Sequence, residues 1–404
     1  MKHTRTTENR VMNKKLIALA IATLPAVAMA DVTIYGRLVG GIERDSITQN
    51  QNGVQLTADS QGNVTGATAT PNKKSTQTNV EDYLSWIGFK GQEDLGNGLK
   101  AIWQVENYIA IDGTGTTFHN QGTFASRDSF VGLAGGFGKV RLGKLTNAQR
   151  DMFDLDVWNN SNGANALDIF KRVAYRPNNS IRYDSPDFAG FSGSLLWGAG
   201  ENKNAGAATN PSGKSSDVVN AGLNYRNAGF FAQYGYDKRK NANSPFGNPE
   251  GKAASAHTVE AGYGADGLLV SAGFQRTKGY HWSDRAYFNE TGGFATGAAD
   301  SLRTREVALT AAYSIGAWTP KVSLAKGFDQ KDVDGKVNDS GYKQYILGVD
   351  YALSKRTKLS AAYGHLSFGE NADYAAASGN GPSIDNLLNV KKQSTTSLSV
   401  EHWF

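Results

Sequence analysis

The sequence contains no cysteine, and beyond residue 30 it has no apolar run that approaches 18 residues. The absence of cysteine excludes a disulfide framework, a thiolate nucleophile and a cysteine-ligated metal. The absence of a long apolar run excludes a membrane-spanning helix in the same region. Apolar residues make up only 39% of the 404 residues, which is little for the core of a large soluble protein. The composition therefore argues against the usual division into two or three soluble domains.

The charge balance excludes another class of function. The formal net charge is +5, but the first thirty residues alone carry five basic side chains and one acidic side chain. The rest of the chain holds 37 basic and 36 acidic side chains. A nucleic-acid partner requires a clear excess of positive charge, so we expect none. The 42 aromatic residues and the small net charge also argue against disorder.

The first thirty residues have the pattern of a secretory signal peptide. Lys14 and Lys15 precede an apolar run over 16–27, and the small residues Ala28 and Ala30 form a cleavage site. The run is too short for a membrane anchor. We expect residues 1–30 to be removed before Asp31, with translation starting at Met1 or Met12, and 31–404 to form a single domain.

Period-two alternation of apolar and polar residues dominates the mature chain, as over 99–106 and 306–313. This period places alternate side chains on opposite faces of a β-strand. We identify sixteen such segments of about 10–13 residues. They begin near Val32, Leu84, Leu99, Phe124, Lys139, Ile181, Phe191, Val218, Phe230, Ala256, Leu268, Leu302, Trp318, Tyr342, Thr357 and Thr395.

The connections between these segments alternate between tight turns and long polar loops, the first long loop spanning 46–80. Strict alternation puts all tight turns at one end of the structure and all long loops at the other. The sequence therefore predicts an all-β fold, a transmembrane antiparallel up-and-down β-barrel of 16 strands. A soluble β-sandwich is the alternative, but it usually has strands of about 5–6 residues and crossovers that break this rhythm.

Aromatic residues gather near the predicted strand ends, where they could form the two girdles that flank the apolar band of a membrane barrel. Some of them could instead be sheet-packing residues. They are Tyr35, Trp86, Trp103, Phe130, Tyr183, Tyr234, Tyr313, Trp318, Tyr351 and Phe404.

Several motifs resemble the major outer-membrane porins of neisserial and related Gram-negative bacteria. They are DVTIYGRL at 31–38, GFKGQEDLGNGLKAIWQVE at 88–106, GGFGKVRLGK at 135–144, RYDSPDFAGFSGSL at 182–195 and the terminal Phe404. The resemblance covers essentially all of 31–404. It implies a homotrimer of sixteen-stranded barrels in the outer membrane, each with a water-filled channel narrowed by an inward-folded third loop. It also implies passive diffusion of ions and small hydrophilic solutes.

The resemblance assigns the constriction to the long connection 147–180, which follows the fifth predicted strand. A charge-rich loop of this length is usually just solvated, but its position favours a pore-lining role. Its acidic candidates are Asp151, Asp154, Asp156 and Asp168, and it also carries the bases Arg150, Lys171, Arg172 and Arg176.

Strand parity predicts which basic residues line the opposing wall, because a charge on the lipid face near the midplane costs roughly 2–4 kcal/mol. Apolar neighbours facing lipid place five bases inside: Arg37, Lys90, Lys100, Lys139 and Arg141. Arg127 and Arg182 resemble family positions that carry eyelet arginines. Their parity is less clear, and either could be a rim residue. Seven bases on the wall against four loop aspartates lean toward weak anion selectivity.

The remaining expectations concern partners and rival functions. Phe404 resembles the signal that the barrel-assembly machinery reads, although it could simply close the barrel against the first strand. Outer-membrane lipid and lipopolysaccharide are expected neighbours, and external loops could bind host-surface ligands. We expect no cofactor and no metal. An enzyme is disfavoured, because the histidines are scattered and no HExxH or serine-nucleophile motif occurs. The alternative function is an outer-membrane adhesin or surface receptor.

Overall fold

The computed structural model describes residues 32–49, 54–58, 64–69, 73–113, 124–158, 165–200, 217–240, 253–280, 302–332, 334–372 and 390–404. The predicted signal peptide and its cleavage site lie outside these residues. None of the described helices has the length and hydrophobicity needed to cross a bilayer. All structural statements below concern the described part of the chain.

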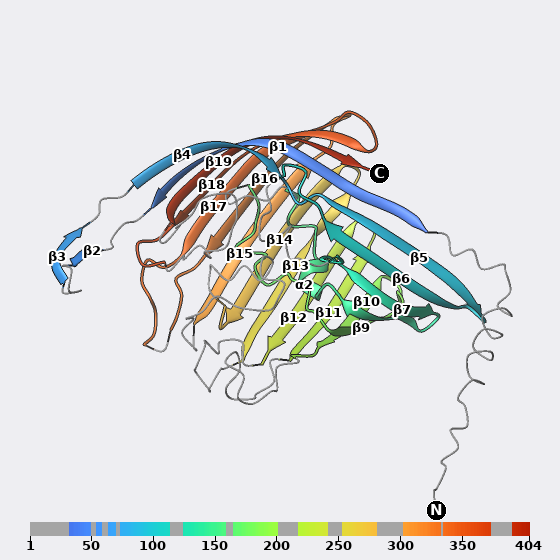
Figure 1. The fold of residues 1–404 in the computed structure, drawn as a ribbon. Coiled ribbons are helices and arrows are strands. Elements are labelled where there is room, and N and C mark those ends of the chain that lie inside the picture. Colours follow the sequence, from blue (N-terminus) through green and yellow to red (C-terminus); the bar gives the residue numbers. More distant parts are fainter. Residues whose placement is uncertain are drawn as a thin grey trace, which may run out of the picture.

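The chain forms one closed antiparallel barrel (Figure 1). Consecutive strands pair in sequence order, and the last strand returns to pair with the first. The first half of the barrel consists of β1 (Thr33–Gln49), β4 (Lys73–Asp82), β5 (Trp86–Gly96), β6 (Leu99–Tyr108), β7 (Ser129–Gly135), β8 (Gly138–Lys144), β9 (Ser180–Asp184), β10 (Phe191–Gly198) and β11 (Val218–Asn227). The second half consists of β12 (Phe230–Arg239), β13 (Ala254–Ala265), β14 (Leu268–Lys278), β15 (Arg303–Tyr313), β16 (Trp318–Gly327), β17 (Tyr342–Ala352), β18 (Thr357–Phe368) and β19 (Val390–Trp403).

The strands β4 and β5 together occupy one strand position of the barrel, because both pair with β1, each along a different part of it. A three-residue break separates them, and Leu84 at its centre has a positive φ of 61°. Side chains replace the missing ladder bonds. The Val39 amide donates to Ser85 Oγ (2.9 Å), and the Ser85 amide donates to the Asp82 carboxylate (3.1 Å). Counting β4 and β5 once gives the sixteen strands that the alternation predicts.

The prediction that 46–80 is all loop is wrong. The strand β1 continues to Gln49, β4 begins at Lys73, and β2 (Val54–Ala58) pairs with β3 (Val64–Ala69) in a separate hairpin beyond the barrel wall (Figure 1). The segment 73–79 is polar throughout, so it lacks the apolar alternation by which a strand is recognised. Strands that extend past the lipid need no apolar face.

The barrel is apolar outside and polar inside, as a water-filled barrel in lipid requires. In β14 and β15 every second residue is exposed outward, including Val270, Phe274 and Leu309. The residues between them point inward and are buried polar side chains, including Gln275 and Glu306.

The largest apolar cluster does not fill the barrel centre. It lies where the connection after β8 folds inward against the inner face of β15–β18, and includes Leu155, Trp158, Phe170 and Ile346. The expected inward-folded loop is therefore packed through apolar side chains against one side of the lumen. Open space is left on the side of β1, β5 and β19.

Candidate functional site

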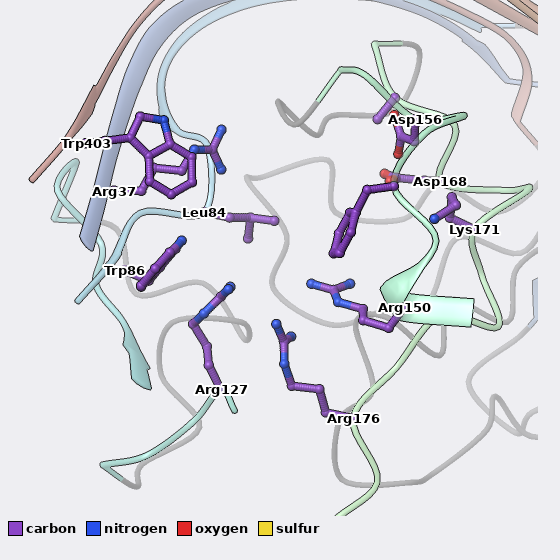
Figure 2. A pocket seen from close by; sticks show the side chains of 12 residues that line it. Arg37, Leu84, Trp86, Arg127, Arg150, Asp156, Asp168, Lys171, Arg176 and Trp403 are labelled. Atoms are coloured by element: carbon purple, nitrogen blue, oxygen red, sulfur yellow. The ribbon is translucent and has the colours of Figure 1, made fainter. Parts of the chain in front are cut away.

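A passage of about 280 Å3 runs between this inward-folded loop and the barrel wall (Figure 2). The wall contributes Arg37, Leu84, Trp86, Arg127 and Trp403. The loop contributes Arg150, Phe153, Asp156, Ala166, Asp168, Lys171 and Arg176. Five basic and two acidic side chains thus face one narrow space.

On the wall, Arg37 projects inward from β1 beside two aromatic rings. Its Nη2 pairs with Glu401 of β19 at 3.2 Å, and its guanidinium lies 5.7 Å from the ring centre of Trp403. Trp86 packs edge-to-face against Trp403, with ring centres 6.0 Å apart. The Trp403 ring and the Glu401 carboxylate hold the arginine in place at the edge of the passage.

Arg127 lies in the turn before β7, so strand parity does not apply to it. The predicted start of this strand, near Phe124, is five residues too early. The Arg127 guanidinium is held between the rings of Trp86 and Tyr108, at 4.8 and 4.7 Å from their centres. Its Nε donates to Glu106 at 3.0 Å. Two cation–π contacts and one charged hydrogen bond fix its direction toward the passage.

The loop begins with a single helical turn, α2 (Ala148–Asp151), capped by Asn147. The Asn147 Oδ1 accepts from the amides of Arg150 (3.0 Å) and Tyr175 (3.2 Å), and its Nδ2 donates to the Val173 carbonyl (2.8 Å). One asparagine therefore ties the start of the loop to its end. This turn directs Arg150 into the passage, where its guanidinium faces the same space as those of Arg127 and Arg176 (Figure 2).

Arg182 clamps α2 to the wall. Its Nη2 lies 2.5 Å from Asp151 and 2.7 Å from Asp184, and its Nη1 donates to the Thr146 carbonyl at 2.6 Å. Arg141 shares Asp184 at 2.6 Å. Both predicted arginines therefore point inward, but they lie behind the loop and are absent from the lining of the passage.

The loop aspartates divide into two pairs. Asp151 binds Arg182, and Asp154 binds Arg226 and Gln233 of the wall, so these two carboxylates anchor the loop. Asp156 and Asp168 line the passage next to Lys171 (Figure 2).

Further contacts fix the loop along the inner wall from β15 to β19. Trp158 Nε1 donates to Ser323 (2.8 Å), and Asn165 Nδ2 donates to Ser397 (2.7 Å). Arg172 forms an ion pair with Glu306 at 2.7 Å and donates to Thr304 at 2.8 Å. The loop thus crosses the lumen on a series of buried polar contacts.

Tyr175 closes the loop on its return. Burial raises the pKa of its phenol well above the ordinary value, and the neighbouring Asp237 carboxylate raises it further. The hydroxyl therefore keeps its proton and donates to Asp237 at 3.0 Å.

The other predicted wall bases lie away from the passage. Lys100 and Lys139 lie at the short-turn ends of β6 and β8. Lys90, near the middle of β5, rests over the Tyr35 ring at 4.6 Å. Phe404 closes the barrel against β1. Its amide donates to the Gly36 carbonyl (3.2 Å), and the Gly36 amide donates to its carbonyl (3.1 Å).

Several lining residues were missed by sequence reasoning. Trp86 was named among the aromatics of the lipid girdle, yet it lines the passage. Strand parity places Tyr35 inward, and its ring packs against that of Trp86 with ring centres 5.3 Å apart. The signal was present, since outward Ile87 and Ile34 fix their neighbours as inward. Arg150, Lys171 and Arg176 could not be placed without the path of the loop. Among the described residues no group of three His, Asp or Glu side chains could hold a metal ion.

Comparison with known proteins decides the family. The Gram-negative porin family model matches residues 16–371. The chain belongs to the Gram-negative porin family. It is 38% identical over 380 residues to the major outer membrane protein P.IB of Neisseria sicca, covering 90% of this chain and 96% of that protein. It is 36% identical over 374 residues to the same protein from Neisseria meningitidis serogroup A, covering 92% and 98%.

Solved structures show the same fold at low identity. The anion-selective porin from Comamonas acidovorans superposes with a TM-score of 0.66 at 22% identity, covering 93% of this chain and 100% of that one. Salmonella typhi OmpF in complex with daunomycin superposes with a TM-score of 0.59 at 17% identity, covering 92% of this chain and 98% of that one. The porin is an outer-membrane channel for ions and small hydrophilic solutes, and not an enzyme. The alternative of an adhesin or receptor is not favoured.

Proposed function

We propose that the passage between the loop and the β1–β5–β19 wall is the constriction of this porin, and that it gives the channel a weak preference for anions. The observation that carries the proposal is the lining of five bases against two acids. In a narrow passage that ions cross partly dehydrated, the sign of the lining charges biases which ion enters.

The preference is weak because carboxylates stand directly behind the bases. Arg37 pairs with Glu401, Arg127 with Glu106, and Arg176 with Asp128. Each guanidinium keeps its positive charge at the edge of the passage, and the carboxylate behind it offsets part of that charge. The long-range field, however, is largely cancelled.

The transverse field runs within the passage rather than simply from wall to loop. Arg127, Arg150 and Arg176 converge on one side, and Asp156 and Asp168 lie on the other (Figure 2). A zwitterionic solute can orient between the two groups, whereas an apolar solute gains nothing to replace its hydration.

The assembly and biogenesis of the porin complete the proposal. The outer faces of β7 and β8 are apolar, with Val131 and Leu142 more than half exposed, and such a surface suits contact between barrels in a homotrimer. Phe404 offers a terminal aromatic to the barrel-assembly machinery. External loops, which lie largely outside the described residues, would meet any host-surface ligand.

Planar-bilayer recording tests the proposed function. The purified oligomer should conduct ions without added substrate. In a salt gradient, the sign of its reversal potential should show that anions permeate more readily than cations. An oligomer that folds but does not conduct would contradict the constriction, because it would leave no open passage. A conducting oligomer with clear cation preference would contradict only the proposed selectivity.

A further inference from the structure

Six basic side chains form a band on the outer face of the barrel, at the long-loop end of β14–β17. The band consists of Arg276, Lys278, Arg303, Arg305, Lys326 and Lys343, all of them exposed. They continue the outward series of Phe274, Val307 and Leu324 on the same strands. Their side chains therefore face the surroundings of the barrel and not the lumen.

The band is built from like charges placed directly opposite one another. Arg276 is the cross-strand partner of Arg305, Lys278 of Arg303, and Lys326 of Lys343. Like charges in directly paired positions destabilise a sheet. Three such pairs on four adjacent strands are a cost that a counter-charge from outside the chain would remove.

The described part of the chain supplies no such counter-charge. None of the six side chains forms an ion pair with a described residue, and the outward positions of β12–β17 contain no Asp or Glu. The nearby Asp329 is already paired with Lys336 at 2.9 Å. Arg305 and Lys326 instead share the ring of Phe328, at 5.9 and 5.0 Å from its centre.

The band lies at a boundary between two environments. Toward the short-turn end, the outward residues become apolar, as with Val307, Leu309 and Leu347. The other side of the band leads into the long connections, which face the outside in barrels of this kind. The flanking strands β13 and β18 carry Ser255 and Ser367 at this end, opposite Lys278 and Lys343, instead of bases. The charge is therefore concentrated on one sector.

We infer that this band binds the phosphate groups of a phosphorylated glycolipid in the outer leaflet, whose acyl chains cover the apolar positions beside it. Arginine forks and lysine ammonium groups are the usual partners of phosphate. A free phosphate ion would neutralise the charge but would make no use of the adjoining apolar surface. The inference rests on the outer-membrane location and is independent of the ion preference proposed for the pore.

The experiment titrates the refolded full-length porin, in a nonionic detergent, with a bis-phosphorylated, multiply acylated glycolipid, and counts bound lipid by native mass spectrometry. The variant R276Q/R305Q/K326Q/K343Q should bind this lipid at least tenfold more weakly than the wild type. The control K355Q/R356Q removes two exposed bases at the opposite, short-turn end and should bind as the wild type does. The dephosphorylated glycolipid should bind equally weakly to all three proteins.

Thermal unfolding without lipid guards against a folding artefact. Since the substitutions remove like-charge repulsion, the lipid-free variant should melt at the same temperature as the wild type or higher. Phosphorylated lipid should then raise the melting temperature of the wild type more than that of the variant. If the fourfold variant does not fold, R305Q alone should show a smaller loss of the same kind.

Three results would overturn the inference. If the fourfold variant bound the phosphorylated glycolipid as tightly as the wild type does, the band would not be the binding site. Equal binding of the dephosphorylated glycolipid would assign the affinity to acyl chains alone. Displacement of the lipid by millimolar inorganic phosphate would make the band a site for a free ion.

Discussion

Arg172 of the inward-folded loop and Glu306 of β15 form a fully buried ion pair, with Nη1 2.7 Å from the carboxylate. Thr304 accepts from Arg172, and Tyr342 donates to Glu306 at 2.9 Å. A charge pair in this setting is costly to bury, but much more costly to break from one side. The loop that defines the passage is therefore held by a contact on the opposite wall of the barrel.

Replacing Arg172 with Met should loosen the loop. The substitution leaves the Glu306 carboxylate buried without its base, which costs roughly 3–5 kcal/mol. We expect a lower melting temperature and a single-channel current with larger fluctuations. Both are measured on the refolded oligomer.

The double variant R172M/E306Q is the control. The neutral amide can still accept from Tyr342, and no charge is left alone, so the melting temperature should return most of the way to that of the wild type. If R172M had the same current fluctuations and the same melting temperature as the wild type, the ion pair would not hold the loop.

Gly36 is expected to be essential for closing the barrel. A Cβ at this position would lie 2.7 Å from the Trp86 carbonyl oxygen and 2.5 Å from the Phe404 ring. Gly36→Ala should therefore destabilise the folded barrel by about 1–3 kcal/mol, as overpacking does. Gly40, also outward on β1, has more room, with the Ile111 side chain at 3.3 Å and the Glu81 carbonyl oxygen at 4.0 Å. Heat-modified gel mobility should show a lower unfolding temperature for G36A than for G40A, and equal values would contradict the tight closure.

The native form is expected to be a homotrimer that resists mild detergent. The apolar outer faces of β7 and β8 would be shielded in such an assembly. Mass measurement in detergent, before and after heating, should show a trimer that dissociates to monomers. A monomer alone under mild conditions would contradict this expectation. The long connection 112–123 is expected to latch onto a neighbouring barrel, and it lies mostly outside the described residues.

The mature protein is expected to begin at Asp31. Intact mass of protein extracted from outer membranes should correspond to residues 31–404. A mass that retains residues 16–30 would mean that the apolar run stays attached as an anchor.

Most of the fold could be predicted from the sequence. In a membrane barrel alternate residues face lipid and lumen, so the alternation of apolar and polar residues shows which way each side chain points. Arg37 was placed inward by Ile34 and Leu38, and Arg141 by Val140 and Leu142, and the structure has both inside. The extension of β1 and β4 was missed because polar strands beyond the lipid carry no alternation. Trp86 was misassigned because an aromatic near a strand end was given more weight than its parity.

The site could be predicted only in part, because it depends on the path of one loop. The partner of Arg172 is 134 residues away, and no local pattern links the two. Asp151 and Asp168 have similar sequence surroundings, yet one anchors the loop and the other lines the passage. Such distinctions arise from long-range packing, which single-sequence periodicity does not contain.

The central claim is that bases from the loop and the wall together make the constriction favour anions, and the reversal potential tests it most directly. At an effective dielectric constant near 20, close unit charges interact by roughly 4 kcal/mol before screening. A residual change of about 1 kcal/mol per ion would alter the permeability ratio roughly fivefold. The variant R127Q/R150Q should therefore move the reversal potential in a 0.1 M salt gradient toward cation preference. D156N/D168N should move it the other way.

The control K355Q/R356Q removes the same charge from an exposed turn and should leave the reversal potential unchanged. All shifts should shrink near 1 M salt, where the Debye length falls to about 3 Å. The account predicts opposite shifts for the two constriction variants and none for the control. Conducting channels in which R127Q/R150Q leaves the reversal potential at its wild-type value at low salt would contradict it.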